Sequence, residues 1–252
     1  MKNALIWYTW FVWSNLDLQY EFDYKYNSKN IWDIDNNSFD LVICAWVRAV
    51  KRYANQHPEE DLQWIENLIT HLKTIQAKKF VLISTIDVYP SPNWAYEDTE
   101  QDFLNNYPYW KNRFYLENFV KDKFKDYLIL RLPWLFGKNI KKNVIFDLLN
   151  NNQIEKIIPN ASFQYYYLDN LWKDIQICID NNLKVVNFAT EPLETQEIID
   201  KFFPETKVWE CVDNPVRYDF KTRYDKIFHG ENWYMYSKNE IINNLSDFIK
   251  NY

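Results

Sequence analysis

The stretch IWYTWFVWSNL, residues 6–16, decides how the rest of the chain is interpreted. It begins inside an apolar run that we expect to form the first strand, residues 4–8, and it carries tryptophan at positions 7, 10 and 13. The 252 residues include 12 Trp but only 2 Gly, whereas an average glycine usage of about 7% predicts roughly 18. Because an α/β protein needs glycine where the backbone φ is positive, the composition indicates tryptophan at positions that glycine normally holds.

Apolar runs and amphipathic segments alternate along the chain. FDLVICAW (39–46) is a near-continuous apolar run, which is typical of a parallel strand buried on both faces. PEEDLQWIENLITHLKTI (58–75) has apolar residues at helical spacing and acidic residues in its first turn. The same patterns predict further strands at 4–8, 78–89, 127–133 and 185–189, and helices at 113–124, 144–151 and 239–252. This order predicts an α/β fold whose parallel sheet is covered by helices on both faces.

The opening stretch resembles the signature of the extended short-chain dehydrogenases/reductases, a strand followed by GxTGFxGSNL, with tryptophan in place of the three glycines. These glycines make the tight turn, let a pyrophosphate approach the backbone and let the helix pack closely on the strand. The resemblance implies a Rossmann doubly wound sheet at residues 1–150 plus the strand near 185–189, with a small C-terminal substrate lobe in the rest of 151–252. It also implies cofactor contacts in this turn, at Trp7, Thr9, Trp10, Phe11, Val12 and Trp13.

Tryptophan replaces an expected glycine elsewhere in the resemblance. Trp46 follows Ala45 where the family has an alanine-glycine pair, and Trp110 and Trp134 stand at two further glycine positions. We hypothesise that most of these tryptophans are glycines in the natural protein. Some bacterial lineages read the UGA codon as glycine, and translating such a gene with a UGA-to-Trp table would give this pattern. The alternative is a Trp-rich protein with a degenerate cofactor site.

The resemblance also implies a catalytic Tyr-x-x-x-Lys pair, for which two placements compete. Tyr107 with Lys111 matches the motif literally. Tyr109 with Arg113 fits the family helix better and places Arg131 at the spacing seen in dTDP-4-dehydrorhamnose reductases, so we favour it. Residues four apart share one helix face, where a cation can lower the tyrosine pKa for general acid/base catalysis. Arginine cannot reproduce the compact contacts of a lysine ammonium.

The ends of other expected strands supply the remaining candidates. Thr85 maps to the family's catalytic Ser or Thr, although a threonine satisfied within a buried strand end is the alternative. The second strand ends without a clear acidic residue for a ribose 2′-hydroxyl, and Asn27, Ser28 and Lys29 could accommodate a 2′-phosphate, which favours NADP over NAD. The resemblance further assigns cofactor contacts to Cys44, Ala45, Trp46, Pro133, Leu135 and Phe136, and substrate contacts to Asn139, Lys142, Asn143 and Gln164.

The net charge and the cysteine content indicate which classes of partner and which redox environment to expect. A net charge of −6 argues against nucleic acid or an anionic membrane as the main partner. The apolar start is too short to span a bilayer. Cys44, Cys178 and Cys211 have no disulfide-framework or metal spacing, so we expect reduced thiols, no metal and a cytoplasmic location. The 58–75 and 113–124 helices could form the homodimer interface common in this superfamily, by analogy only.

The resemblance implies hydride transfer to or from a carbinol or ketone carbon of a small, sugar-like or nucleotide-sugar substrate. Tyr109 would act as acid/base, Thr85 would polarise the oxygen, and Arg113 would hold the ribose. Phe163 replaces an arginine that often binds a nucleotide phosphate, which weakens a sugar-nucleotide assignment. Two rivals stay open: a non-catalytic NAD(P)-binding regulator or scaffold of the same fold, and a structural protein that binds no dinucleotide.

Overall fold

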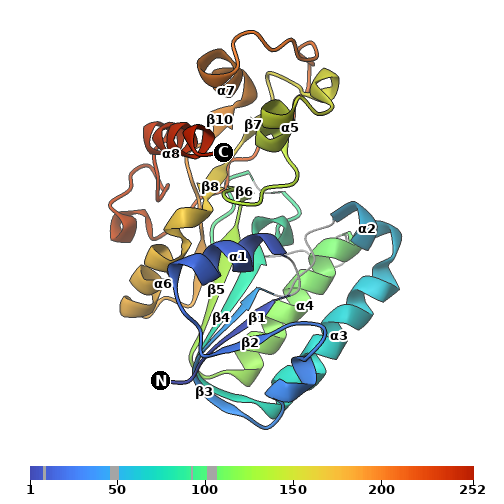
Figure 1. The fold of residues 1–252 in the computed structure, drawn as a ribbon, viewed down its shortest axis with the longest axis vertical. Helices are drawn as coiled ribbons and strands as arrows, with labels where there is room; N and C mark the ends of the chain where they lie inside the picture. Colours follow the sequence, from blue (N-terminus) through green and yellow to red (C-terminus); the bar gives the residue numbers. More distant parts are fainter. Residues whose placement is uncertain (8–9, 46–50, 92, 101–106) are drawn as a thin grey trace.

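The computed structural model describes residues 1–7, 10–45, 51–91, 93–100 and 107–252, without the side chains of Trp7 and Trp10. The described strands are β1 Asn3–Trp7, β2 Tyr24–Tyr26, β3 Ser38–Ala45, β4 Gln76–Thr85, β5 Tyr127–Leu132, β6 Trp134–Phe136, β7 Ser162–Phe163, β8 Tyr165–Tyr167, β9 Val185–Asn187 and β10 Leu193–Glu194. The described helices are α1 Trp10–Gln19, α2 Lys51–Gln56, α3 Pro58–Thr74, α4 Pro108–Lys123, α5 Val144–Asn150, α6 Leu171–Asp180, α7 Thr195–Phe202 and α8 Lys238–Lys250 (Figure 1).

Six strands of the described chain form one parallel sheet in the order β2-β1-β3-β4-β5-β9. The chain passes from β1 to β2 on one side and then returns to place β3 on the other side of β1. The strand order therefore reverses at β1, and the carboxyl ends of β1 and β3 flank the switch point at which doubly wound sheets bind their ligands. The Rossmann-type α/β fold expected from the sequence is confirmed.

Alternate residues of the central strands point to opposite faces of the sheet. Ala4 and Ile6 are buried in the core that β1 shares with α3 and α4, whereas Leu5 is buried in the core on the face covered by α1 and α6 (Figure 1). On that second face, the rings of Tyr20 and Trp172 stack with their centroids 4.0 Å apart and join α1 to α6. Because both faces are covered, the strands are apolar almost throughout rather than alternating.

The C-terminal part of the chain forms a smaller lobe at one end of the sheet (Figure 1). Two short two-stranded sheets, β6 with β8 and β10 with β7, carry it, and α5, α7 and α8 lie around them. From the same part of the chain, β9 returns to the main sheet beside β5, and α6 lies against α1. The division of the chain at residue 150 stays a prediction.

Both glycines of the chain lie where a side chain would collide. A Cβ at Gly137 would come within 2.9 Å of the Asn15 side-chain oxygen, and a Cβ at Gly230 within 1.9 Å of the Tyr234 carbonyl oxygen. Asn15 also accepts a 3.0 Å hydrogen bond from the backbone N–H of Lys138 and donates a 2.8 Å bond to its carbonyl. The close approach at Gly137 therefore ties α1 to the loop after β6.

Two of the described tryptophans occupy a backbone region that favours glycine. Trp94 has a φ of 61° and Trp233 a φ of 68°, and each directly follows an asparagine. Trp233 and Asn232, whose φ is 56°, are the two residues between Glu231 and Tyr234, which form an antiparallel β-bridge. Positive φ at both central residues is characteristic of the type I′ hairpin turn, for which Asn-Gly is the preferred pair. A bulky side chain is an outlier in this conformation.

Candidate functional site

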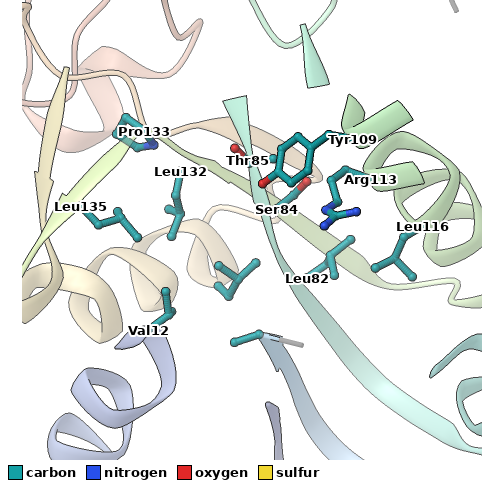
Figure 2. A pocket seen from close by; sticks show the side chains of 12 residues that line it. Val12, Leu82, Ser84, Thr85, Tyr109, Arg113, Leu116, Leu132, Pro133 and Leu135 are labelled. Atoms are coloured by element: carbon teal, nitrogen blue, oxygen red, sulfur yellow. The ribbon is translucent and has the colours of Figure 1, made fainter. Parts of the chain in front are cut away.

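A cavity of about 110 Å³ lies at the switch point, where the ends of β3, β4 and β5 meet α1 and α4 (Figure 2). A space of this size suits a ring-sized group rather than a whole dinucleotide. Its lining combines a few polar side chains with many apolar ones, as is usual for small-molecule sites. The lining residues are Val12, Ala45, Leu82, Ile83, Ser84, Thr85, Tyr109, Arg113, Leu116, Leu132, Pro133 and Leu135.

Thr85 lies at the last position of β4 and faces the cavity beside Tyr109 (Figure 2). Its side-chain oxygen accepts a 3.2 Å hydrogen bond from the backbone N–H of Asp87. This bond caps the short 3-10 turn Ile86–Val88. The hydroxyl hydrogen is therefore available for a second partner. A hydroxyl at the end of a central strand, aimed into an apolar cavity, can donate a hydrogen bond to the oxygen of a bound carbonyl group.

Tyr109 is placed in the cavity by the start of α4. Pro108 stands in the first turn of this helix, where its missing N–H costs nothing, and the Tyr109 N–H donates to the side chain of Asn55 on α2 at 3.1 Å. Tyr109 itself is buried, whereas both members of the rival pair, Tyr107 and Lys111, are exposed. Burial raises the pKa of the Tyr109 phenol, which Arg113 opposes without cancelling.

Arg113 lies one helical turn after Tyr109 with its guanidinium 4.2 Å from the centre of that ring. The guanidinium makes a two-point ion pair with Asp61 on α3, in which Nη2 lies 2.9 Å from Oδ1 and Nη1 bonds to Oδ2. Both side chains are buried, and Asn112 adds a 2.8 Å hydrogen bond to the same carboxylate. The sequence gives no signal that singles out Asp61, because acidic residues are ordinary in the first turn of a helix.

A second buried ion pair supports the wall that carries Thr85. Ser84 donates a 2.6 Å hydrogen bond to Glu117 on α4, and Glu117 pairs with Arg131 on β5, with Oε2 2.6 Å from Nη2. Arg131 in turn donates to the hydroxyl of Tyr89 at 2.6 Å. The carboxylate of Glu117, the guanidinium of Arg131 and the hydroxyl of Tyr89 all have hydrogen-bond partners inside the protein. The network therefore fixes α4 against β4 and β5. The sequence predicted no role for Ser84, since the family's catalytic Ser or Thr maps to its neighbour Thr85.

The first turn is described only in part. Thr9 and Trp46, two of the expected cofactor contacts, lie outside the described residues, as do the side chains of Trp7 and Trp10. Val12 lines the cavity, whereas Phe11 and Trp13 are half-buried against the core. The helix that starts at Trp10 begins beside the carboxyl end of β1, which is where a Rossmann fold binds a pyrophosphate.

The residues after β2 lie at the same edge of the sheet as the cavity, because all six strands run parallel. Asn27 accepts a 2.8 Å hydrogen bond from the backbone N–H of Lys29 and so forms a tight turn. Ser28 and Lys29 are exposed at the tip of this turn. A cation and a hydroxyl at this edge are suited to an anionic group on the ribose of a dinucleotide.

Some of the remaining residues expected to contact the cofactor line the cavity, and others are buried in the core. Pro133 and Leu135 line the cavity, and Ala45 closes it at the end of β3. Cys44 is fully buried on the opposite face of the sheet. Phe136 is also fully buried and stacks on Tyr167, with ring centroids 4.9 Å apart.

The substrate candidates are mainly engaged in holding the lobe. Gln164 is fully buried, donates to the carbonyls of Thr190 and Phe220 and accepts from the Phe220 N–H. Asn143 caps α5 by accepting from the Phe146 N–H at 3.1 Å. Asn139 has a φ of 68° and donates to Ser14 on α1 at 3.4 Å, and Lys142 is exposed. The structure does not bring these four residues to the cavity lining.

Asp87 joins three parts of the molecule beside the cavity. Its carboxylate lies 3.2 Å from the Lys51 ammonium on α2 and accepts a 3.4 Å hydrogen bond from the hydroxyl of Tyr218, which comes from the C-terminal lobe. The Lys51 ammonium also lies 5.0 Å from the centre of the Trp110 ring. Asp87 is thus an acidic group close enough to influence Tyr109.

No group of His, Cys, Asp or Glu side chains that could hold a metal ion is found among the described residues. In the same part of the chain, every helix is too short or too polar to cross a membrane.

Solved structures share the fold over the full length of the chain. A dTDP-4-dehydrorhamnose reductase from Bacillus anthracis, solved in complex with NADP, is similar with 17% identity and a TM-score of 0.75, over 100% of both chains. The corresponding reductase from Clostridium acetobutylicum has 15% identity and a TM-score of 0.75, over 98% of both chains. A UDP-N-acetylglucosamine 4-epimerase from Methanobrevibacter ruminantium has 16% identity and a TM-score of 0.76, over 99% of this chain and 97% of the other. No curated protein sequence matches the chain.

The profile of the NAD(P)H-binding family matches residues 37–162, which is half of the chain. The match begins after the Trp-containing first turn, so it rests on the strands and the helix that carry Thr85 and Tyr109. The apolar cavity at the switch point has the size of the nicotinamide ring of an NAD(P) cofactor rather than of the whole dinucleotide, and the resemblance to extended short-chain dehydrogenases/reductases is confirmed. The chain belongs to the NAD(P)H-binding family.

Proposed function

We propose that the protein is an NAD(P)-dependent reductase or epimerase that acts on a carbonyl or carbinol carbon of a sugar-like substrate. The observation that supports this most directly is the convergence of Thr85 and Tyr109 on one apolar cavity at the switch point of the sheet. A threonine donor and a tyrosine acid beside a nicotinamide-sized space suit the polarisation and protonation of a substrate oxygen. The solved structures of similar fold include enzymes of nucleotide sugars, which supports a sugar or a nucleotide sugar as the substrate.

The roles of the side chains follow from their positions. The dinucleotide, when bound, supplies or accepts the hydride. Thr85 donates a hydrogen bond to the substrate oxygen, and Tyr109 gives or takes the proton at that oxygen. Pro133 and Leu135 provide apolar contacts for the nicotinamide ring and exclude water. Arg113 was expected to hold the ribose, but its guanidinium is engaged by Asp61, so we assign it to the support of Tyr109.

We further infer that the cofactor is NADP rather than NAD. Lys29 and Ser28 are exposed at the tip of the turn after β2, where a 2′-phosphate would lie, and neither makes a side-chain hydrogen bond among the described contacts that would occupy it. NADPH should bind more tightly than NADH, and a titration of both followed by fluorescence measures the difference. Equal affinities would contradict the preference without affecting the catalytic proposal.

The recoding of UGA as glycine belongs to this proposal, because three tryptophans in the first turn would obstruct a pyrophosphate. The positive φ values of Trp94 and Trp233 support it independently, since neither lies in that turn. Mass spectrometry of the protein from its native host tests the idea, because each replacement of tryptophan by glycine lowers the mass by a large amount. Tryptophan at position 10 in the native protein would contradict it.

Two further expectations stay within the proposal. The exposed sides of α3 and α4 are the surface on which we place a homodimer contact, by analogy with the superfamily. The buried thiols of Cys44 and Cys178 suit a reducing, cytoplasmic environment.

The decisive experiment compares Tyr109→Phe with the parent protein, both carrying glycine at positions 7, 10 and 13. Dinucleotide affinity should be the same in both, while turnover of a nucleotide-sugar ketone should fall by about 10² or more in the variant. Tyr107→Phe is the matched control, since Tyr107 is exposed and directly precedes the same helix. Binding without turnover in the parent would instead support the rival reading, a non-catalytic NAD(P)-binding regulator or scaffold.

A further inference from the structure

The buried carboxylate of Asp61 lies behind the wall of the cavity that Arg113 forms. It lies on α3, which does not line the cavity, yet it is buried and bonded to two consecutive residues of α4, Asn112 and Arg113. An arginine buried without a counter-ion would be strongly unfavourable. Asp61 therefore makes it possible for a guanidinium to occupy the position that faces Tyr109.

The ion pair also fixes where the guanidinium lies. Two parallel N–H···O bonds hold a planar guanidinium in a single orientation, which one ammonium contact would not do. In that orientation Arg113 lies 4.2 Å from the centre of the Tyr109 ring, on the wall of the cavity. The ring is thereby packed between the helix and the end of β4 where Thr85 lies (Figure 2).

The charge of the pair matters as much as its geometry. A lone cation beside a phenol favours the phenolate, whereas a cation that already carries a carboxylate partner favours it much less. In the described part of the chain, the groups that face Tyr109 are Arg113 on its own helix, Asp61 on α3, Asp87 in the turn after β4, and Tyr218 from the C-terminal lobe. Lys51 on α2 is paired with Asp87. Among the described residues, the two cations near Tyr109, Arg113 and Lys51, are thus each matched by a carboxylate.

We propose that Asp61 is a positioning residue of the active site, which holds Arg113 against Tyr109 and neutralises its charge, so that Tyr109 stays protonated as a proton donor for carbonyl reduction. This inference rests on the proposed function. In the reduction, a hydride from the reduced nicotinamide cofactor adds to the carbonyl carbon as the C=O π bond breaks. The phenolic proton of Tyr109 passes to the oxygen to complete the alcohol, and the phenolate regains a proton from solvent.

Asp61→Asn tests the proposal because it removes the carboxylate charge and keeps the shape. Arg113 is then an unmatched cation, so Tyr109 should ionise at least about one pH unit lower. Absorbance titration of tyrosinate should show one tyrosine that ionises at a lower pH than in the parent protein, and this difference should be absent in Asp61→Asn/Tyr109→Phe. The pH at which reductase turnover declines should move down by the same amount. A titration identical to that of the parent protein overturns the proposal.

A second variant covers the possibility that Asp61→Asn does not fold. Asp61→Asn/Arg113→Gln leaves no unpaired charge at this buried position, so it should fold and keep the pH profile of the parent within about half a pH unit, while turnover falls because the ring has lost its support. A downward shift in this double variant, or parental turnover, overturns the proposal. The titration needs no substrate, so it decides the role of Asp61 even if Tyr109→Phe were to show that the proposed function is wrong.

Discussion

Asn232 and Trp233 are consecutive residues with positive φ, 56° and 68°, and together they turn the chain between the bridged residues Glu231 and Tyr234. Asparagine tolerates this conformation, and glycine is the residue that normally follows it in such a turn. The indole of Trp233 is 45% exposed, so packing does little to offset the backbone strain.

We therefore expect Trp233→Gly to stabilise the protein by about 1 kcal/mol, since a left-handed conformation costs a side-chain-bearing residue about 1–2 kcal/mol. Thermal unfolding followed by circular dichroism measures the change. Trp209→Gly is the matched control, because Trp209 is 58% exposed and is not among the residues with positive φ. A loss of stability in both variants would show that Trp233 is suited to its turn.

Thr85→Val should remove the donor to the substrate oxygen while leaving the shape of the strand end unchanged. Loss of one such donor typically costs about 10² in kcat, and dinucleotide affinity should change little because the cavity keeps its volume. Steady-state kinetics and a separate binding titration measure the two effects. Ser84→Ala is the control, since the Ser84 hydroxyl is bonded to Glu117 and its loss should reduce stability more than turnover. An equal loss of turnover in both variants argues against a specific role for Thr85.

The parallel sheet could be predicted because its strands are buried on both faces and carry long apolar runs. The predicted strand 39–46 corresponds to Ser38–Ala45, and 127–133 to Tyr127–Leu132. The helix expected at 113–124 begins five residues earlier, as Pro108–Lys123. Pro108 was the available start signal. In the lobe, β7 and β10 have two residues each, which is too short for any periodicity to be visible.

The candidate site could be predicted only as far as local motifs reach. Thr85 and Tyr109 follow from a strand end and a helix motif, and the cavity contains both. The partner of Arg113 lies 52 residues away on another helix, and no sequence spacing encodes such a contact. The same holds for Gln164, whose side chain fits a motif for substrate binding but bonds to the backbone of Phe220, 56 residues later.

Glu117→Gln should destabilise the protein strongly, because it leaves the buried Arg131 without its counter-ion. Breaking a buried pair from one side typically costs 3–5 kcal/mol, and Ser84 also loses a charged acceptor. Urea unfolding measures the free energy. Asp98→Asn is the control: Asp98 pairs with Arg223, and the two side chains are 68% and 46% exposed, so its loss should cost less than about 1 kcal/mol. Similar losses in both variants would mean that the Glu117 network contributes little beyond a surface pair.

The buried carboxylate of Asp174 should make stability depend on pH. It accepts hydrogen bonds from the hydroxyls of Tyr166 and Tyr236 at 2.6 and 2.9 Å, and burial raises its pKa from 3.8 to about 6. A carboxyl group with a raised pKa contributes stability that is complete below about pH 4 and is lost as the pH rises through about 6. At about 1.4 kcal/mol per pH unit, this contribution amounts to roughly 3 kcal/mol. Urea unfolding between these pH values should show the fall in the parent protein and not in Asp174→Asn; the same fall in both would assign it to another group.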